Sequence, residues 1–532
     1  MLAQIKRVRF LLFCLIIVSS LAGCGGGGGG GDVSGTPDDT SAPTTPTGLT
    51  AQADSSTIIL LSWNAASDNV AVLGYRIYRG GAMIQDLFSP ASLEFEDKGL
   101  TPNTTYAYTI SAYDSVGNES AQSAVVQATT FGIRVVQFGT TADDEGDGVG
   151  VDSSGNVYVA GITTGTLGMA SYGGQDYFVR KYDPDKNLLW TVQFGSATDE
   201  QVHALAVDPG GNSYVAGSTE GDLTAVPHQL RDAFLVKYDS AGTLQWIQQP
   251  STSFYDEAWA VAVDSDNSRV YVAGGTNGSF SGPNAGQIDI FLIQYDLDGI
   301  PQWNRQLGTS ANDIPFAAAV DGSGNVYLTG QTLGDLDGAG PGTLQGYADA
   351  FLVKYNSSGD LLWVTQWGTA DYDDGDGVAV DGAGNIYVTG TTYGALGASN
   401  AGGADLYLAK FDASGNQLWI RQTGSSNEDY TRAVGVNGSG NVYVTGSTLG
   451  VLSDPGEGGS DLFLVVYDSS GALQGKTQGG SSGNDEGDGI AIDPGNNCLY
   501  LTGATDGGVD GNANLGGRDA LLIKLGFDGE LL

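Results

Sequence analysis

The chain has 532 residues, with 61 acidic against 21 basic side chains, a formal net charge of −40, and 84 glycines. This length exceeds one ordinary hydrophobic core, so several folded units are expected. The negative field repels phosphate backbones, which argues against nucleic acid as a partner. Three cysteines are too few for a disulfide framework.

Residues 1–23 have the pattern of a signal peptide. The basic stretch Lys6–Arg9 precedes an apolar run, Phe10–Ser20, that is too short for a membrane span. The run ends in Leu21-Ala22-Gly23-Cys24, which resembles the bacterial lipobox. The resemblance implies that Cys24 carries lipid and anchors the chain in the cell envelope, with the outer membrane favoured. The alternative is an ordinary signal peptide with an incidental cysteine.

Residues 24–43 are rich in Gly, Ser, Thr, Pro and Asp, including seven consecutive glycines, Gly25–Gly31. A segment of this composition cannot bury apolar surface. We therefore expect a flexible tether that holds the folded parts away from the membrane.

Residues 44–130 predict a β-sandwich. Apolar and polar residues alternate in Tyr106–Ser111, as in a strand with one buried face. Trp63 is placed to fill the centre, and Leu100 followed by Tyr106 fits the corner of such sandwiches. With Pro46–Leu49 and Gly74–Tyr78, this pattern resembles a fibronectin type III domain, an immunoglobulin-like fold. The resemblance implies a spacer or a generic binding module.

Residues 131–532 are built from repeats of about 57 residues. A Gly-Asn-x-Tyr-Val-x-Gly motif, or a looser copy, places tyrosines at Tyr158, Tyr214, Tyr271, Tyr327, Tyr387, Tyr443 and Tyr500. Each copy predicts four short strands, and seven copies of four strands predict an all-β chain ending in a seven-bladed β-propeller. The motif resembles that of the bacterial seven-bladed propeller repeat family. An open solenoid is the alternative fold.

The ends of the repeat region predict how the ring closes. Val135–Gly139 matches Thr191–Gly195, a fourth strand, yet it precedes the first full repeat. The last repeat stops at Glu530–Leu532, before its own fourth strand. We therefore expect the N-terminal strand to complete the last blade and to cover two sheet edges.

Two columns of the repeat keep the same residue in most or all copies. An invariant aspartate opens the third strand at Asp176, Asp232, Asp289, Asp349, Asp405, Asp461 and Asp519. We expect it to accept hydrogen bonds from turn N–H groups in every blade. A tryptophan recurs in the fourth strand, at Trp190, Trp246, Trp303, Trp363 and Trp419, and predicts packing between blades.

A second acidic column precedes the first strand of each repeat. It comprises Asp144, Glu200, Asp256, Asp313, Asp373, Asp429 and Asp485. Carboxylates among glycines can bind Ca²⁺, although no run has the spacing of an EF-hand loop. The alternative is a turn acceptor. Calcium is therefore a candidate ligand, and no other cofactor is expected.

The last column varies. It comprises Asp147, His203, Trp259, Phe316, Asp376, Arg432 and Asp488, while its neighbours stay small or apolar. One varied residue per blade at the channel mouth predicts a ligand-binding rim. Drift at a solvated rim is the alternative interpretation.

No catalytic residue is assigned, because the sequence holds two histidines and no Gly-x-Ser-x-Gly or His-Glu-x-x-His motif. We expect a lipid-anchored envelope protein, facing the periplasm or the exterior, whose propeller binds a protein or a glycan. One alternative is a carbohydrate-active hydrolase or lyase that uses Asp147, Asp376 or Asp488. Another is a periplasmic assembly scaffold.

Overall fold

The computed structural model describes residues 39–53, 58–100, 104–129, 135–168, 171–224, 230–338, 346–453, 456, 458–529 and 531. The expected leader, Cys24 and most of the tether lie outside these residues. The described residues form strands and turns and contain no helix. No described segment is therefore a helix long and apolar enough to cross a membrane.

The N-terminal domain is the predicted sandwich of two sheets. Trp63 packs edge-on against Tyr75, with ring centroids 5.5 Å apart, and Leu100 is buried with them. Tyr108 is fully buried, and its hydroxyl donates to Asp97 at 2.7 Å. One sheet has the order β1-β2-β5 and the other β4-β3-β6-β7. The strands are β1 (Thr47–Ala53), β2 (Ile59–Asn64), β3 (Val72–Arg79), β4 (Ala82–Leu87), β5 (Glu94–Asp97), β6 (Thr105–Asp114) and β7 (Val126–Thr129).

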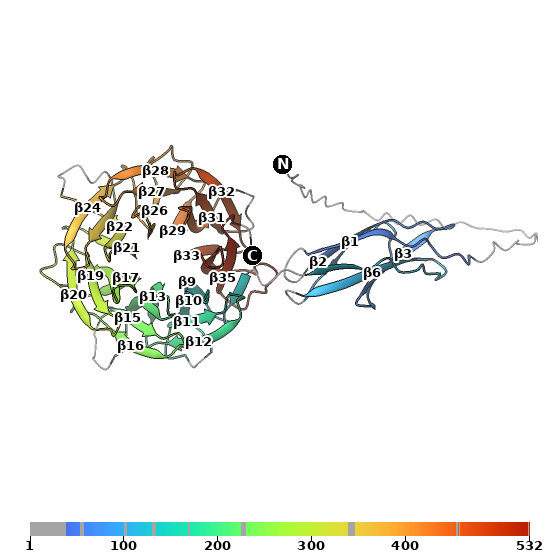
Figure 1. Cartoon of the computed structure of the whole chain (residues 1–532), viewed down its shortest axis with the longest axis horizontal. Helices are drawn as coiled ribbons and strands as arrows, with labels where there is room; N and C mark the ends of the chain where they lie inside the picture. The colour runs from blue at the N-terminus through green and yellow to red at the C-terminus, as the bar shows by residue number, and fades with distance from the viewer. Residues whose placement is uncertain are drawn as a thin grey trace, which may run out of the picture.

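The repeats form seven four-stranded antiparallel sheets among the described residues, arranged around a central channel (Figure 1). Each sheet is one blade, and its first strand is innermost. The strands are β8 (Val135–Phe138), β9 (Asp144–Val151), β10 (Val157–Thr163), β11 (Asp176–Tyr182), β12 (Leu188–Phe194), β13 (Glu200–Val207), β14 (Ser213–Thr219), β15 (Asp232–Tyr238), β16 (Leu244–Gln248), β17 (Asp256–Asp264), β18 (Arg269–Thr276), β19 (Asp289–Asp296), β20 (Pro301–Leu307), β21 (Asp313–Val320), β22 (Val326–Thr332), β23 (Asp349–Tyr355), β24 (Leu361–Trp367), β25 (Gly377–Val380), β26 (Ile386–Thr392), β27 (Asp405–Phe411), β28 (Gln417–Thr423), β29 (Asp429–Val436), β30 (Val442–Thr448), β31 (Asp461–Tyr467), β32 (Leu473–Gly479), β33 (Asp485–Asp493), β34 (Cys498–Thr505) and β35 (Asp519–Gly526).

The last blade has the order β33-β34-β35-β8, so its outer strand comes from the start of the repeat region. β8 pairs with β35 from Phe138 opposite Ala520 to Val135 opposite Ile523. Gln137 adds a side-chain bond from its Nε2 to the Asp519 carboxylate at 2.7 Å. The inner strand β33 also contacts β9, which closes the ring of inner strands.

The repeated motif builds a turn at one face of the propeller. In the first blade, Asp152 Oδ1 accepts the backbone N–H groups of Ser154 and Asn156, both at 2.9 Å. The side chains of Asn156 and Tyr158 donate to the other oxygen, at 2.7 and 3.1 Å. Gly155 has φ of +78°, a left-handed conformation that favours glycine. The Gly-Asn-x-Tyr signature is thus the set of partners of one buried aspartate.

The invariant third-strand aspartates lie at the opposite face and accept hydrogen bonds as expected. Asp176 Oδ2 accepts the N–H of Tyr172 at 2.9 Å and Nε2 of Gln193, from the fourth strand, at 2.8 Å. The recurrent tryptophans pack beside the motif tyrosines, as with Trp190 and Tyr158 at 5.9 Å.

The sixth blade departs from the tryptophan pattern. Gly475 occupies the tryptophan position of β32, and no described atom lies within 4 Å of where its Cβ would be. Phe527, from the turn after β35 in the next blade, instead packs against Tyr443, with centroids 5.7 Å apart. An aromatic contact is thus kept at this interface by a residue from a different strand.

Candidate functional site

The seven residues of the variable column converge on one cavity at the channel mouth, with a volume of about 570 Å³. Asp147 shows how they do so: Gly146 pairs with Gly161 and Gly148 with Ala160, which leaves Asp147 as the extra residue of a β-bulge. The same break occurs at His203, Trp259, Phe316, Arg432 and Asp488. A bulge releases its residue from the ladder and re-aims the side chain, here toward the channel.

The bulge explains the last glycine of the repeated motif. A Cβ on Gly161 would lie 1.9 Å from the carbonyl oxygen of Glu145, and every blade repeats this close approach. Only glycine fits beside the displaced backbone. The glycine is therefore the sequence signal that accompanies the bulge.

The fifth blade reaches the same result differently. Its inner strand β25 begins only at Gly377, one residue after Asp376. The preceding backbone bends, with the Gly375 N–H bonded to the Gly330 carbonyl of the neighbouring blade at 3.1 Å. This bend brings both Asp374 and Asp376 to the cavity.

Three consecutive blades give the mouth an aromatic sector. The His203 ring stacks on Trp259, with centroids 4.2 Å apart and an angle of 23°, and Phe316 meets Trp259 edge-on at 5.7 Å. His203 Nε2 lies 3.2 Å from Oε1 of Glu257. Burial alone would raise the pKa of Glu257, but the hydrogen bond with His203 and the charge of Arg231 outweigh it and lower the pKa.

The other blades give an acidic sector with one arginine from the variable column. Arg432 Nε lies 3.6 Å from Asp488. Burial raises the pKa of Asp488 to about 7, although Arg432 opposes the shift. Burial also raises the pKa of Asp147 well above its ordinary value, and the charges of Asp488 and Glu145 add to this effect.

Asp374 and Asp376 form a carboxyl pair at the mouth, in which Asp374 is buried and Asp376 is partly buried. Burial and their mutual repulsion raise the pKa of Asp374 well above its ordinary value, and burial also raises that of Asp376. Asp376 Oδ2 accepts the hydroxyl groups of Thr431 at 2.6 Å and Thr391 at 3.2 Å. Two adjacent carboxyl groups disfavour double ionisation, which agrees with the raised pKa of both.

The sequence predicted no role at the mouth for a second tier of residues, whose acids it showed only as neighbours of the second acidic column. It contains Glu145, Asp374 and Glu486, two positions before the bulge residue, together with Arg518, which precedes the invariant Asp519. Arg518 binds Glu145 at 2.6 Å and Glu486 at 2.9 Å, and so ties the first blade to the last. The column that contains Glu145 and the column that contains Arg518 both vary between repeats, and this variation is the sequence signal that could have marked them as part of the mouth.

The second acidic column, the candidate calcium site, is fully buried, and its carboxylates accept hydrogen bonds within each turn. Asp144 Oδ2, for example, accepts the N–H of Thr140 at 2.6 Å and its hydroxyl at 2.9 Å. Burial raises the pKa of all seven acids. Among the described residues, the one group of three acids close enough to share a metal is Asp39, Asp68 and Asp114, in the sandwich. The geometry of the column is thus that of a turn acceptor.

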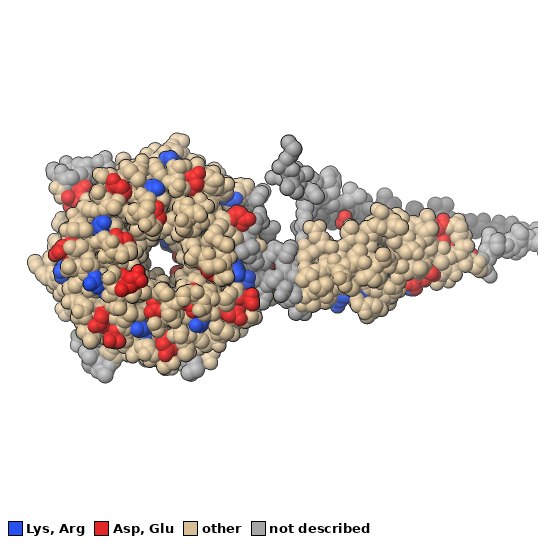
Figure 2. Space-filling model, viewed as in Figure 1, with Lys and Arg blue, Asp and Glu red and all other residues tan. Residues whose placement is uncertain are grey.

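Charged side chains of both signs surround the central channel, which is open on the face shown in Figure 2. The mouth lies on the face that carries the connections between second and third strands, because Thr163 pairs with both Asp144 and Asp176. These connections are longer than the turns at the other face and vary in sequence. Variable loops on a repeated scaffold are a common place for recognition.

Comparison with known proteins agrees with this architecture. A fibronectin type III model matches residues 42–129, and a beta-propeller repeat model matches residues 133–168, 189–224, 302–337, 362–397 and 418–452. Exoglucanase B of Cellulomonas fimi is 46% identical over 92 residues, which is 17% of this chain and 8% of that protein. Chitinase Chi52 of Paenibacillus xylanexedens is 42% identical over 92 residues, 17% of each protein.

The chain thus spans less than a fifth of the length of these curated relatives. Among solved structures, hydrazine synthase of Kuenenia stuttgartiensis aligns over 69% of this chain and 94% of that one, at 12% identity and a TM-score of 0.43. With both family models matched and both folds described, the chain contains a fibronectin type III domain followed by repeats of the beta-propeller repeat family.

Proposed function

We propose that this protein binds carbohydrate at the channel mouth of its propeller. The observation that carries the proposal is the pairing of an aromatic sector, His203, Trp259 and Phe316, with an acidic sector around one cavity. Aromatic faces stack on the apolar faces of sugar rings, and carboxylates accept hydrogen bonds from sugar hydroxyl groups. Convergent polar groups beside aromatic surface are typical of ligand sites.

The relatives support the same class of ligand. Proteins that share a segment of about one domain with this chain include an exoglucanase, a chitinase and an alpha-amylase. The shared segment has about the length of the fibronectin type III domain, which serves as a spacer in this proposal. The propeller then supplies the binding surface.

The proposal includes an anchor in the bacterial envelope, with the outer membrane favoured. Cys24 at the end of the expected leader would carry the lipid, and residues 25–43 would separate the propeller from the bilayer. A Cys24→Ser variant should lose incorporation of labelled palmitate and move from the membrane fraction to the soluble fraction. Unchanged labelling in that variant would refute the anchor and leave the carbohydrate site untouched.

A glycan array followed by calorimetry tests the binding function. We expect selective binding without turnover, and at least a tenfold loss of affinity in Trp259→Ala, taking sugar stacking to be comparable to the stacking of a nucleic-acid base on one aromatic side chain, which contributes about 1–3 kcal/mol. Phe88→Ala is the matched control, since Phe88 is 76% exposed and lies in the sandwich. Equal affinities of the two variants, or binding by neither protein nor variant to any glycan, would overturn the proposal.

A second candidate function is glycoside cleavage, and the Asp374–Asp376 pair favours it. Carboxyl groups whose pKa values lie above the ordinary range can act as general acids at neutral pH. In this case the bound glycan would be hydrolysed, and Asp376→Asn would abolish turnover while keeping affinity. Release of no reducing ends from any bound glycan would reject this candidate and retain the first.

A further inference from the structure

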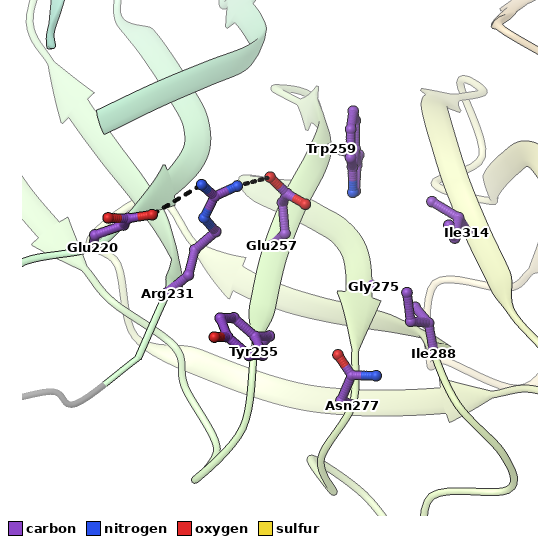
Figure 3. A pocket seen from close by; sticks show the side chains of 9 residues that line it. All are labelled: Glu220, Arg231, Tyr255, Glu257, Trp259, Gly275, Asn277, Ile288 and Ile314. Carbon is purple, nitrogen blue, oxygen red and sulfur yellow. Dashed lines mark hydrogen bonds and ion pairs between the residues drawn. The ribbon is translucent and has the colours of Figure 1, made fainter. Parts of the chain in front are cut away.

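Two more hollows adjoin the channel mouth. The first has a volume of about 450 Å³ and lies over the third blade, bordered by Tyr255, Glu257 and Asn277. Figure 3 shows Arg231 between Glu220 and Glu257, with Tyr255 nearby. Trp259 lines both this hollow and the cavity of the mouth, so the two spaces meet at its ring.

The second hollow has a volume of about 630 Å³ and lies over the fifth blade. Four tyrosines, Tyr347, Tyr372, Tyr393 and Tyr430, line it. Tyr372 and Tyr393 meet edge-on at 6.1 Å, and the hydroxyl groups of Tyr393 and Tyr430 are 3.3 Å apart. Tyr372 and Asp374 also line the mouth, which makes this hollow continuous with it.

The three spaces together form a trough across the mouth, with aromatic surface in each part. A site for one or two sugar rings needs only one of them, since each already has the 300–1,000 Å³ of an ordinary ligand pocket. A row of such spaces is the shape that fits a linear chain, with successive rings resting on Tyr255, Trp259 and Tyr393.

The charge of the trough selects among such chains. Nine carboxylates and three arginines line the three hollows. Each arginine is already paired: Arg231 with Glu220 and Glu257, Arg432 with Asp488, and Arg518 with Glu145 and Glu486. The carboxyl groups outnumber the arginines, so ionisation of the remaining acids gives the trough a negative potential, which repels uronate and sulfated chains and attracts cations.

One carboxylate oxygen at the mouth lacks a hydrogen-bond donor. Asp147 Oδ2 is buried at the mouth and accepts no hydrogen bond from the described residues. A buried acceptor without a partner is costly, so a ligand that supplies a donor there gains affinity. An ammonium group supplies up to three donors and a positive charge.

We propose that the trough binds a linear glycan bearing free amino groups, a chain of glucosamine-type units that lies across the channel mouth. The inference rests on the proposed carbohydrate function and adds its chemical class and length. Ring faces stack on the aromatic side chains, ammonium groups meet Asp147 and Asp376, and nearby tyrosine rings add cation–π attraction. Asp147 and Asp376 have raised pKa values, so binding an ammonium ion ionises them and releases protons.

The test is calorimetry with the full chain in mild detergent. Glucosamine oligomers of two, four and six units are compared with N-acetylglucosamine oligomers of the same lengths. We expect the amino hexamer to bind at least tenfold more tightly than the amino dimer and than the acetylated hexamer. We also expect the affinity for the amino hexamer to fall with salt and the binding to release protons near pH 7.

Two variants test where the glycan lies in the trough. Tyr393→Ala should weaken binding of the amino hexamer and leave the dimer unchanged, because Tyr393 lies in the outer hollow. Asp147→Asn should reduce the preference for amino over acetylated chains, and Asp376→Asn is the second variant if the first does not fold. Phe88→Ala again serves as the control.

The outcomes separate this inference from the proposed function. Equal binding of amino and acetylated chains overturns the charge preference, and equal binding of dimer and hexamer overturns the trough, while carbohydrate binding stands in both cases. A lysine hexapeptide that binds as tightly as the amino hexamer also overturns the inference. Binding of no glycan at all defeats the proposed function itself.

Discussion

Asp488→Asn tests the electrostatics of the channel mouth. Burial raises the pKa of Asp488 from 3.8 to about 7 in the folded protein. A carboxyl group whose pKa is higher in the folded than in the unfolded state binds its proton more tightly when folded. Its contribution to stability is therefore present below the unfolded pKa and is lost as the pH rises through about 7. Asparagine cannot ionise and so removes this pH dependence.

The size of the effect follows from the shift. About two of the three pH units lie above pH 5, and each unit corresponds to about 1.4 kcal/mol, which gives an upper limit of about 3 kcal/mol. Because the Asp488 side chain is 19% exposed, solvent screening reduces the free-energy difference below this limit. We expect that wild type loses about 1.5 kcal/mol more stability than Asp488→Asn between pH 5 and pH 8.

Urea unfolding at the two pH values, followed by tryptophan fluorescence, measures this difference, since seven of the eight tryptophans lie in the repeat region. Asp412→Asn is the control: hydrogen bonds from Asn416 lower the pKa of Asp412, so its titration falls below pH 5. The control should follow wild type between pH 5 and pH 8. Parallel curves for wild type and Asp488→Asn would refute the assignment of a buried, destabilising carboxylate at the mouth.

Three further changes test the frame. Gly330→Ala places a Cβ 1.9 Å from the carbonyl oxygen of Ile314. We expect this clash to lower the free energy of unfolding by about 2–4 kcal/mol, which thermal denaturation detects. An unchanged melting temperature would show that the bulge can relax. Deletion of residues 131–139, of which 135–139 are described, should unfold the ring, so a deletion variant with wild-type circular dichroism and melting temperature would contradict strand-mediated closure. Phe527→Ala should destabilise the propeller by about 1–3 kcal/mol, whereas Phe254→Ala, at a side chain that is 53% exposed, should have no measurable effect.

The frame of the propeller could be predicted because its residues recur. Asp176 and its six equivalents never vary, and a position identical in every repeat serves a need that every blade shares. The closing strand was equally visible, because Val135–Gly139 is a copy of a fourth strand in the wrong place. Seven internal copies here replace the comparison that a set of homologues would provide.

The site was predicted less completely. The variable column marked Asp147 and its equivalents, but the bulge that aims them was missed, although Gly161 within a strand is a recognised sign of one. Glu486 lies in β33 and Arg518 immediately precedes β35, so their contact depends on the register of three strands of the last blade. Phe527 lies in the next blade and takes the place of the missing tryptophan beside Tyr443. Comparison of equivalent repeat positions cannot show this, because Phe527 and the tryptophans occupy different positions.

The bulge has a consequence for how such a ring acquires new ligands. In six blades the extra residue of the inner strand lies outside the ladder, so exchanging Trp259 or Arg432 leaves the paired residues of the strands in place. A library that randomises the codons of the variable column would therefore change the side chains at the channel mouth while the strands kept their register. Natural selection has the same freedom, because it can change the residues at the channel mouth one blade at a time while the strands of the propeller stay paired.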